Sequence, residues 1–258
     1  MTESHGRSRA IDLNADLGEL PEALADGREE ALLRLVTSAN VACGGHAGDA
    51  ATMSGVLALA RRLGKSVGAH PSYPDRASFG RDSLRMTPDE IEATVFDQVR
   101  ALAAVAARID VEVTHVKPHG ALYNDAAGDE AIATAIARAV RRWSREAVLV
   151  GLAGSVALDV FASAGLRTAA ECFADRVYEA DGTLRSRKLP GALISDPEMA
   201  AEQAVSIARR GHAIGRGGST VPITADTICV HGDTPGALLI AASVRAALET
   251  AGIDIRPF

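Results

Sequence analysis

The chain has 258 residues, 47% of them hydrophobic and 23% charged, which suits a globular protein with a sizeable core. Its formal net charge of −6 and its pI near 5.7 argue against a nucleic-acid-binding protein, which normally carries a basic patch or stripe. No apolar run reaches the ~18 residues of a membrane span, and the polar first ten residues lack the apolar segment of a signal peptide. Three cysteines without CxxC spacing disfavour a disulfide framework and a zinc-thiolate site. We therefore expect a cytoplasmic protein with no nucleic-acid or membrane partner.

Short β-rich runs alternate with amphipathic stretches along the chain. The predicted strands cover residues 11–17, 38–43, 66–70, 111–117, 148–152, 168–173 and 227–231. The clearest helix is predicted over 88–108, where Thr87 and Glu90 form a capping box around Pro88. Further helices are predicted to start at Asp49, Asp196-Pro197 and Thr234-Pro235.

This alternation predicts parallel strands joined by right-handed helical crossovers. Seven strands are an odd number for an open sheet but close to the number in a (β/α) barrel. No linker or repeat divides the chain, so we expect a polar tail over 1–10 and one α/β barrel domain of about seven parallel strands over 11–258. The glycine-rich stretches 182–194 and 211–225 are predicted to form long loops or small hairpins over one barrel mouth.

Polar and ionisable residues follow nearly every predicted strand. Six strand ends carry Asn14, Asp16 and Glu19; Asn40 and His46; His70; Lys117 and His119; Glu171, Asp175 and Arg176; and His231 and Asp233. In a parallel barrel these ends converge on one face, where active sites are built. The agreement of six separate segments predicts a catalytic face.

The first and fourth strands carry ionisable groups that we expect inside the barrel. Period-two alternation puts Asp12, Asn14 and Asp16 on one side of the first strand, and a buried acid must be paired, hydrogen-bonded or metal-bound. Asp12 has an equally good structural interpretation, satisfying polar groups inside the barrel. Lys117 either loses its charge through burial and acts as a base, or pairs with Asp16 and stabilises an oxyanion. His115, deeper in the fourth strand, is interpreted as structural.

The histidines at three strand ends each have a functional and a structural interpretation. Cys43, close to His46, is either a nucleophile paired with that histidine or, more commonly, a buried and inert thiol. His70 is held by the prolines that follow it, and is either catalytic or hydrogen-bonded to the turn backbone. Asp233 either orients His231 and raises its basicity or caps the next helix.

Several segments, taken together, resemble the LamB/YcsF family, whose members are described as the A component of 5-oxoprolinase. They are IDLNADLGE (11–19), SANVACGGHAGD (38–49), GAHPSYPD (68–75), FGR (79–81), VKPHGALYN (116–124), ADR (174–176) with Tyr178, DG (181–182) and VHGDTP (230–235). The resemblance covers essentially residues 11–257. One small departure is Cys172, where the family usually has alanine between glutamate and phenylalanine.

The resemblance implies a distorted β/α barrel, similar in shape to glycoside hydrolase and polysaccharide deacetylase barrels. It also implies a hydrolase acting on a cyclic amide C–N bond: the ATP-dependent opening of 5-oxo-L-proline (pyroglutamate) to L-glutamate, together with the B and C components of 5-oxoprolinase as partners. The chain has no GxGxxG motif, and Leu59 stands where a P-loop needs its first glycine, so ATP is expected to act through the complex. A homo-oligomer and a bound divalent metal ion are both compatible with this sequence.

The implied reaction assigns roles to the strand-end residues. An unstrained lactam resists water, and phosphorylation of its oxygen makes the ring carbon electrophilic. We expect the partners to supply the phosphoryl step and the barrel to direct water, with Asp16 or His119 as general base and Lys117 stabilising the oxygen. The predicted catalytic residues are Asp16, His46, His70, Lys117, His119, His231 and Asp233. The predicted substrate-binding residues are Asn14, Glu19, Asn40, Arg76, Tyr123, Glu171, Asp175, Arg176, Tyr178 and Arg187. The arginines of this second set would hold the substrate carboxylate.

Two other functions are compatible with the same residues. A stand-alone, metal-dependent amidase or carbohydrate deacetylase would use Asp16, His46 and His70 as ligands of a divalent ion. A chain without catalytic activity would only bind substrate or regulate its partners. Metal analysis of the purified chain separates the first of these from the ATP-dependent function, and single substitutions combined with an assembly assay separate the second.

Overall fold

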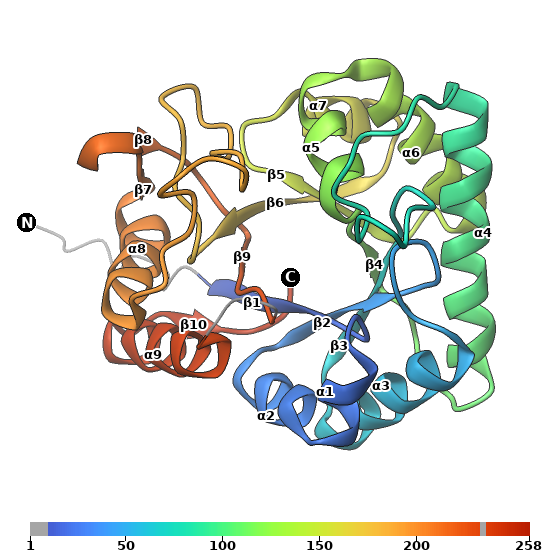
Figure 1. Cartoon of the computed structure of the whole chain (residues 1–258), viewed down its shortest axis with the longest axis horizontal. Helices are drawn as coiled ribbons and strands as arrows, with labels where there is room; N and C mark the ends of the chain where they lie inside the picture. The colour runs from blue at the N-terminus through green and yellow to red at the C-terminus, as the bar shows by residue number, and fades with distance from the viewer. Residues whose placement is uncertain (1–9, 233–235) are drawn as a thin grey trace, which may run out of the picture.

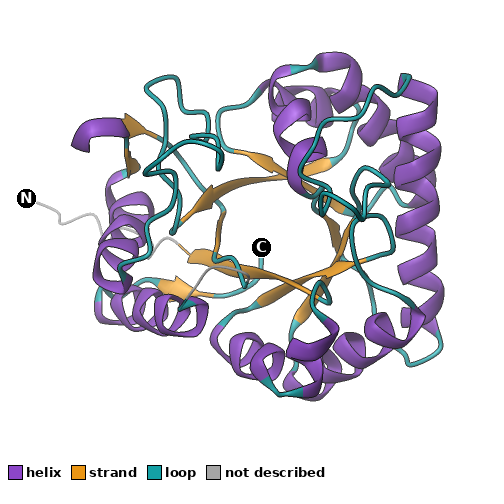
Figure 2. Ribbon diagram, viewed as in Figure 1, coloured by secondary structure: helices purple, strands orange, loops and turns teal. Residues whose placement is uncertain are grey.

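Seven parallel strands close into a barrel in the computed structural model, which describes residues 10–232 and 236–258 (Figures 1 and 2). In order around the barrel, the strands of this described part are β1 (Ala10–Leu17), β2 (Ser38–Ala42), β3 (Ser66–His70), β4 (His115–Val116), β5 (Val148–Leu152), β6 (Arg167–Phe173) and β9 (Thr227–Cys229). Strand β9 closes the ring, because Cys229 lies opposite Phe173 of β6 and opposite Asn14 of β1. The predicted α/β barrel of about seven parallel strands is confirmed.

Helices surround the ring of strands on its outer side (Figure 2). They are α1 (Pro21–Ala25), α2 (Arg28–Leu35), α3 (Ala50–Leu63), α4 (Pro88–Ala107), α5 (Gly120–Gly128), α6 (Glu130–Trp143), α7 (Val156–Ser163), α8 (Pro197–Arg210) and α9 (Ala237–Thr250). The main apolar core contains both strand residues, such as Leu13 and Val41, and helix residues, such as Val99 and Ile240. Within the described ranges, no helix has the length and apolar character that crossing a bilayer requires.

The helix starts follow the capping signals in most places. The Thr87 hydroxyl accepts the backbone N–H of Glu90 and the Glu90 carboxylate accepts that of Thr87, so the predicted capping box is present at α4. The side chains of Asp49 and Asp196 cap α3 and α8 as predicted. Helix α9 differs, because it begins at Ala237 after Gly236. The predicted start at Thr234-Pro235 lies outside the described residues.

Two short strands, β4 and β10 (Asp254–Ile255), differ from the prediction, and a predicted hairpin is present. Strand β4 is limited to His115–Val116 instead of 111–117, and Pro118, which has no N–H, cannot extend the ladder beyond Lys117. The stretch 211–225 forms a hairpin of β7 (His212–Ile214) and β8 (Thr220–Pro222), one of the two predicted alternatives. Strand β10 (Asp254–Ile255), which was not predicted, pairs with β1 outside the ring.

Asp12 lies inside the barrel, near the amino-terminal ends of the strands, and is hydrogen-bonded on both sides. The carboxylate of Asp12 accepts hydrogen bonds from Ser38 Oγ (2.6 Å) and Thr227 Oγ1 (2.5 Å), which come from the two strands that flank β1. The C-terminal Phe258 packs nearby against Val148 and the apolar side chains around it. Asp12 therefore satisfies polar groups inside the barrel, which was one of its two predicted roles. The ionisable residues that follow the strands lie at the opposite, carboxyl end of the barrel.

A second polar layer lies above Asp12. Asn40 Nδ2 donates to Asn14 Oδ1 (2.8 Å), and Asn40 Oδ1 lies 3.0 Å from His115 Nε2. Burial lowers the pKa of His115 to about 3, so its ring is neutral and structural, as predicted. A Cβ at Gly68 would lie 2.1 Å from the ring of His115, so only glycine leaves room for this imidazole inside the barrel.

Candidate active site

A cavity of ≈ 410 Å³ lies at the carboxyl end of the barrel strands, in the size range of small-molecule sites. Its lining includes Asp16, Glu19, His70, Arg81, Lys117, His119, Tyr123, Phe173, Arg176, Arg187, Lys188 and His231. Residues from the stretch 182–194, among them Thr183 and Ser186, form part of its wall. The strand ends therefore meet at one mouth, and one of the two glycine-rich stretches covers it as predicted.

Lys117 forms the charged floor of this cavity. Its Nζ lies 2.9 Å from Asp16 Oδ1, 2.9 Å from Glu171 Oε1 and 3.1 Å from Cys229 Sγ. Burial by itself would lower the pKa of Lys117, but the negative charges of Asp16 and Glu171 hold it well above its ordinary value. Lys117 is therefore an ammonium paired with acids, and the alternative of a neutral lysine base is not supported.

Asp16 is ionised, and its carboxylate contacts three partners. Its Oδ1 accepts from Lys117 Nζ and from Asn40 Nδ2 (2.9 Å), and its Oδ2 lies 3.3 Å from His70 Nε2. Burial opposes ionisation, but the charges of His70 and Lys117 hold the pKa of Asp16 well below its ordinary value. A carboxylate with so low a pKa is a weak general base. Asp16, Cys229 and His231 also lie close enough together to share a cation, but the ammonium of Lys117 already contacts the first two.

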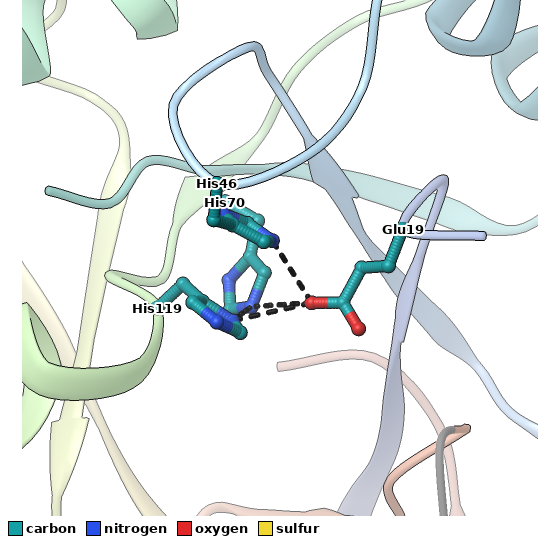
Figure 3. Close-up of side chains that lie close together, drawn as sticks. All are labelled: Glu19, His46, His70 and His119. Atoms are coloured by element: carbon teal, nitrogen blue, oxygen red, sulfur yellow. Dashed lines mark hydrogen bonds and ion pairs between the residues drawn. The ribbon is translucent and has the colours of Figure 1, made fainter. Parts of the chain in front are cut away.

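Four side chains from the first four strand ends gather beside Asp16. Figure 3 shows the carboxylate of Glu19 directed at the rings of His46, His70 and His119. Glu19 Oε1 lies 3.0 Å from His46 Nε2, 3.8 Å from His70 Nε2 and 3.2 Å from His119 Nδ1. The rings of His46 and His119 stack at 3.6 Å between centroids. The set predicted as metal ligands had Asp16 in place of Glu19 and lacked His119.

The protonation of this group is uneven. Burial lowers the pKa of His46 to about 4, so this ring is neutral at pH 7. Burial would raise the pKa of Glu19, but hydrogen bonds from His119 and His46 hold it below its ordinary value. Burial raises the pKa of the Cys43 thiol to about 12, which favours the interpretation of Cys43 as an inert, buried residue.

His231 and Asp175 form a carboxylate–imidazole pair on the other side of the cavity. His231 Nδ1 lies 2.9 Å from Asp175 Oδ1, and the ring stacks on Phe173 with an interplanar angle of 11°. Burial opposes ionisation of Asp175, but His231 holds its pKa below the ordinary value. The pair orients the imidazole and places the proton on Nδ1, which leaves Nε2 as the acceptor. The predicted partner, Asp233, lies outside the described residues.

Tyr123 and two arginines supply hydrogen-bond donors. Burial, and then the charge of Glu171, raise the pKa of Tyr123 well above its ordinary value, so its hydroxyl stays protonated. Burial and the charge of Arg187 lower the pKa of Arg176 only to about 10, so this guanidinium remains positive at neutral pH. Both arginines line the cavity, as their predicted role in binding a carboxylate requires.

The structure places other predicted substrate-binding residues away from the cavity lining. Arg76 is exposed and donates to the carbonyl oxygens of Gly44 and Gly48, so it holds the loop after β2. The Tyr178 hydroxyl accepts the backbone N–H of Phe173 (2.8 Å) and is fully buried. Both side chains bond to the backbone of their own surroundings and neither lines the cavity, so direct substrate contact is not supported for either.

Four further residues of that set lie inside the barrel or behind the site. Asn14 and Asn40 belong to the second polar layer, where Asn14 Nδ2 also donates to Glu171 Oε1 (2.9 Å). Glu171 is fully buried and pairs with Lys117. Asp175 contacts His231 and not the cavity. None of the four lines the cavity, and each contacts a residue that does or a neighbour of one.

Sequence reasoning missed four residues of the site. Arg81 and Lys188 line the cavity, Phe173 supports His231, and the carbonyl oxygen of Phe79 lies 2.9 Å from His119 Nε2. Arg81 and Phe79 stand within the quoted family segments, and Lys188 stands within the predicted covering stretch. A backbone carbonyl has no signal in a side-chain pattern.

Glu29 behind the site provides a pH-dependent test of this electrostatic picture. Burial raises its pKa to about 7, although the N–H of Gly18 donates to Oε1 (2.7 Å). A folded pKa above the unfolded value means that its contribution is present below pH ~4.5 and lost as the pH rises through about 7. We expect Glu29→Gln, which keeps the acceptor, to be more stable than the wild type by about 3 kcal/mol at pH 8 and nearly equal to it at pH 4.5 in urea unfolding.

Glu30 is the matched control for this prediction. Its hydrogen bonds with Arg34 and Arg62 lower its pKa, so Glu30→Gln is expected to lose a little stability at pH 8 instead of gaining it. A Glu29→Gln curve parallel to the wild-type curve from pH 4.5 to 8 would contradict the prediction.

The fold and the cavity define a parallel β/α-barrel protein whose cavity, at the carboxyl end of the strands, is lined by ionisable side chains. Residues 11–258 match the model of the LamB/YcsF family. A protein of Chloroflexus aggregans, named as the A component of 5-oxoprolinase, is 56% identical over 247 residues, which are 96% of this chain and 98% of that protein. This chain belongs to the LamB/YcsF family.

Solved structures agree with this assignment. The crystal structure of a Lactam Utilization Protein from Thermus thermophilus has a TM-score of 0.89 and 41% sequence identity, covering 96% of this chain and all of that one. The catalytic domain of a peptidoglycan N-acetylglucosamine deacetylase from Eubacterium rectale has a TM-score of 0.51 and 12% identity, covering 98% of this chain and 90% of that one. The second likeness concerns the fold alone, and the predicted similarity to deacetylase barrels is confirmed at that level.

Proposed function

We propose that this chain is the A component of a 5-oxoprolinase and that its barrel mouth takes part in the ATP-dependent opening of 5-oxo-L-proline to L-glutamate. The observation that carries the proposal is one cavity lined by the Asp175-supported imidazole of His231, the protonated Tyr123 and the guanidinium of Arg176. The relatives named as this component of 5-oxoprolinase, at 46–56% identity over nearly the whole chain, support the substrate class.

The chemistry requires activation of the lactam before water attacks. An amide resists attack because its resonance is lost in the transition state. Transfer of a phosphoryl group from ATP to the amide oxygen removes that resonance and leaves ADP. Water then adds to the ring carbon, the C–N bond breaks to give an acyl phosphate, and a second water releases glutamate and phosphate. We propose that the partner B and C components supply the nucleotide and the phosphoryl step.

His231 is the group that we assign to the proton transfers. Its Nε2 takes a proton from the attacking water and returns a proton to the departing ring nitrogen. Asp16 is a poorer base because of its low pKa, and both ring nitrogens of His119 are engaged, one by the carbonyl of Phe79 and one by His70 and Glu19. This assignment replaces Asp16 and His119 as general bases.

The remaining charges orient the substrate. Arg176 and Arg187 bind the substrate carboxylate, and the Tyr123 hydroxyl donates to the activated oxygen. The ammonium of Lys117 has acidic partners already, so it acts on the developing negative charge through its field and not through a new hydrogen bond. The acids of the barrel floor hold that ammonium in place.

Glutamate formation from 5-oxoproline tests the proposal directly. The chain is assayed alone, with ATP, with the co-encoded partner chains, and with both, while released glutamate and phosphate are measured. We expect glutamate only when partners and ATP are present, in equal amounts with phosphate. Full activity of the partners in the absence of this chain would overturn the proposal.

A stand-alone, metal-dependent amidase is the second candidate function. The gathering of Glu19 with His46, His70 and His119 favours it, because imidazole and carboxylate are common ligands of hydrolytic metal ions. Glutamate, or the product of hydrolysis of another amide, formed by the chain with a divalent ion but without ATP and partners would favour this candidate over the first.

A further inference from the structure

We propose that Glu19, His46, His70 and His119 bind one divalent transition-metal ion of the zinc type. This inference concerns ion binding by these side chains and does not depend on the reaction proposed above.

The four groups come from consecutive strands of the barrel. Glu19 follows β1, His46 follows β2, His70 ends β3 and His119 follows β4, and each of these strands is hydrogen-bonded to the next. All three rings are buried. Donor atoms fixed at the ends of neighbouring strands have little freedom to separate, which is the preorganisation that a metal site requires.

The distances between donor atoms match the edges of a small coordination polyhedron. In a tetrahedral site with metal–ligand bonds of ~2.0–2.1 Å, neighbouring ligand atoms are about 3.3 Å apart. Glu19 Oε1 lies 3.0, 3.8 and 3.2 Å from the nearest nitrogens of His46, His70 and His119, and His70 Nε2 lies 2.9 Å from His119 Nδ1. All four donor atoms fall within 4.8 Å of one another.

The hydrogen bonds behind two rings direct their lone pairs at this shared point. His70 Nδ1 lies 2.7 Å from the carbonyl oxygen of Lys117, and His119 Nε2 lies 2.9 Å from that of Phe79. A carbonyl only accepts, so these two nitrogens carry hydrogens, and His70 Nε2 and His119 Nδ1 face each other and the carboxylate of Glu19. Two ring nitrogens at 2.9 Å need either a proton or a metal ion shared between them, and the nearby third imidazole and carboxylate favour the metal ion.

The turn at Phe79-Gly80 is shaped around these rings. Phe79 has a φ of 56°, which is uncommon for a residue other than glycine, and its carbonyl reaches His119. A Cβ on Gly80 would lie 2.9 Å from His46 Cβ and 3.0 Å from His119 Cδ2. A backbone carbonyl that fixes the tautomer of a ligand histidine is the usual support behind a metal site.

The chemistry of the donors selects the kind of ion. Three imidazoles and one carboxylate suit zinc and its transition-metal neighbours, whereas magnesium and calcium prefer sites built from oxygen. Such an ion, when bound, supplies a Lewis acid for a carbonyl or phosphoryl oxygen and lowers the pKa of a bound water. Asp16 is left to Lys117 and borders the site only through His70.

Metal binding by the full-length chain tests the inference without an activity assay. The purified chain is stripped with a chelator and titrated with Zn²⁺ by calorimetry, with Mg²⁺ in a parallel titration. We expect one Zn²⁺ per chain, an increase in the unfolding temperature with Zn²⁺, and the visible spectrum of four-coordinate Co²⁺ when cobalt replaces zinc. Mg²⁺ should produce none of these effects.

Variants identify the ligands. Glu19→Gln and His119→Gln are expected to weaken Zn²⁺ binding at least as much as the roughly 10–100-fold that loss of an outer-shell partner causes. His212→Gln, which alters a histidine of the β7–β8 hairpin outside the group, should bind as the wild type does. Circular dichroism of the metal-free variants shows whether they fold, and the calorimetry of the folded variants is then decisive.

Two results would overturn the inference. One is Zn²⁺ binding that Glu19→Gln and His119→Gln leave unchanged. The other is a stripped wild-type chain that binds no Zn²⁺ while nitrogen-15 spectra show His70 or His119 doubly protonated at pH 7, since a proton would then satisfy the facing lone pairs.

Discussion

Replacing Lys117 by methionine is expected to cost about 3–5 kcal/mol of folding free energy, because it leaves buried carboxylates without their cation. The side chains of Lys117, Asp16 and Glu171 are 2%, 7% and 0% exposed, so water cannot replace the lost ion pairs. Methionine keeps most of the volume of the lysine stem, which limits any cavity contribution. Urea unfolding at pH 7, monitored by circular dichroism, measures the loss.

Two further variants serve as a control and a partial rescue for the Lys117→Met measurement. Lys188→Met removes an exposed ion pair with Asp82 and is expected to change stability by less than ~1 kcal/mol. Lys117→Met combined with Glu171→Gln removes one of the stranded charges, and we expect it to recover part of the lost stability. A Lys117→Met loss no larger than that of Lys188→Met would show that the floor of the cavity is not held by these ion pairs.

Replacing His231 by glutamine is expected to lower kcat for glutamate formation in the reconstituted complex by roughly 10²–10⁴-fold, the usual contribution of a general acid–base group. Stability should fall only modestly, because the glutamine amide can still donate to Asp175, which also lies in the field of Arg187 and Arg176. KM for 5-oxoproline should change much less than kcat, since Arg176 and Arg187 remain to bind the carboxylate. ATP-dependent glutamate release under saturating substrate is the measurement.

The partner of His231 provides a second readout. Asp175→Asn keeps the size of the side chain but removes the carboxylate that fixes the Nδ1 proton, so we expect a large loss in kcat together with an altered pH profile. His212→Gln, on the β7–β8 hairpin, is the control that should keep full activity. An Asp175→Asn complex with wild-type kcat and pH profile would remove His231 from the proton-transfer role.

Much of the fold was predictable because its signals are local. The alternation of Asp12, Asn14 and Asp16 with Leu13 and Ala15 determines which side of β1 faces inward, and the structure buries both sets accordingly. Short polar caps before helices are equally local, since Thr87 and Asp196 bond to N–H groups two or three residues away. Pro118 ended β4 for the same kind of reason, but the prediction placed its start too early.

The location of the site could be predicted from the sequence, but the contacts between its side chains could be predicted only in part. Parallel strands place their carboxyl ends at one mouth, which is why Asp16, His70, Lys117 and His231 line one cavity. Which partner each side chain takes depends on the width and twist of the closed ring. Lys117 illustrates this, because its pairing with Asp16 was one of two predicted alternatives, whereas its second acid, Glu171, was assigned to the substrate.

Local patterns were enough to predict the order of strands and helices, the inward acids of β1 and the gathering of imidazoles and acids at the strand ends. The pairing of His231 with Asp175, fifty-six positions earlier, and the contact of Glu19 instead of Asp16 with three histidines became clear only in the folded chain. The difference lies in the range over which each interaction acts. Backbone propensities, caps and alternation act over a few residues, whereas ion pairs and shared lone pairs depend on distances of a few ångströms that are set only when β9 closes against β1.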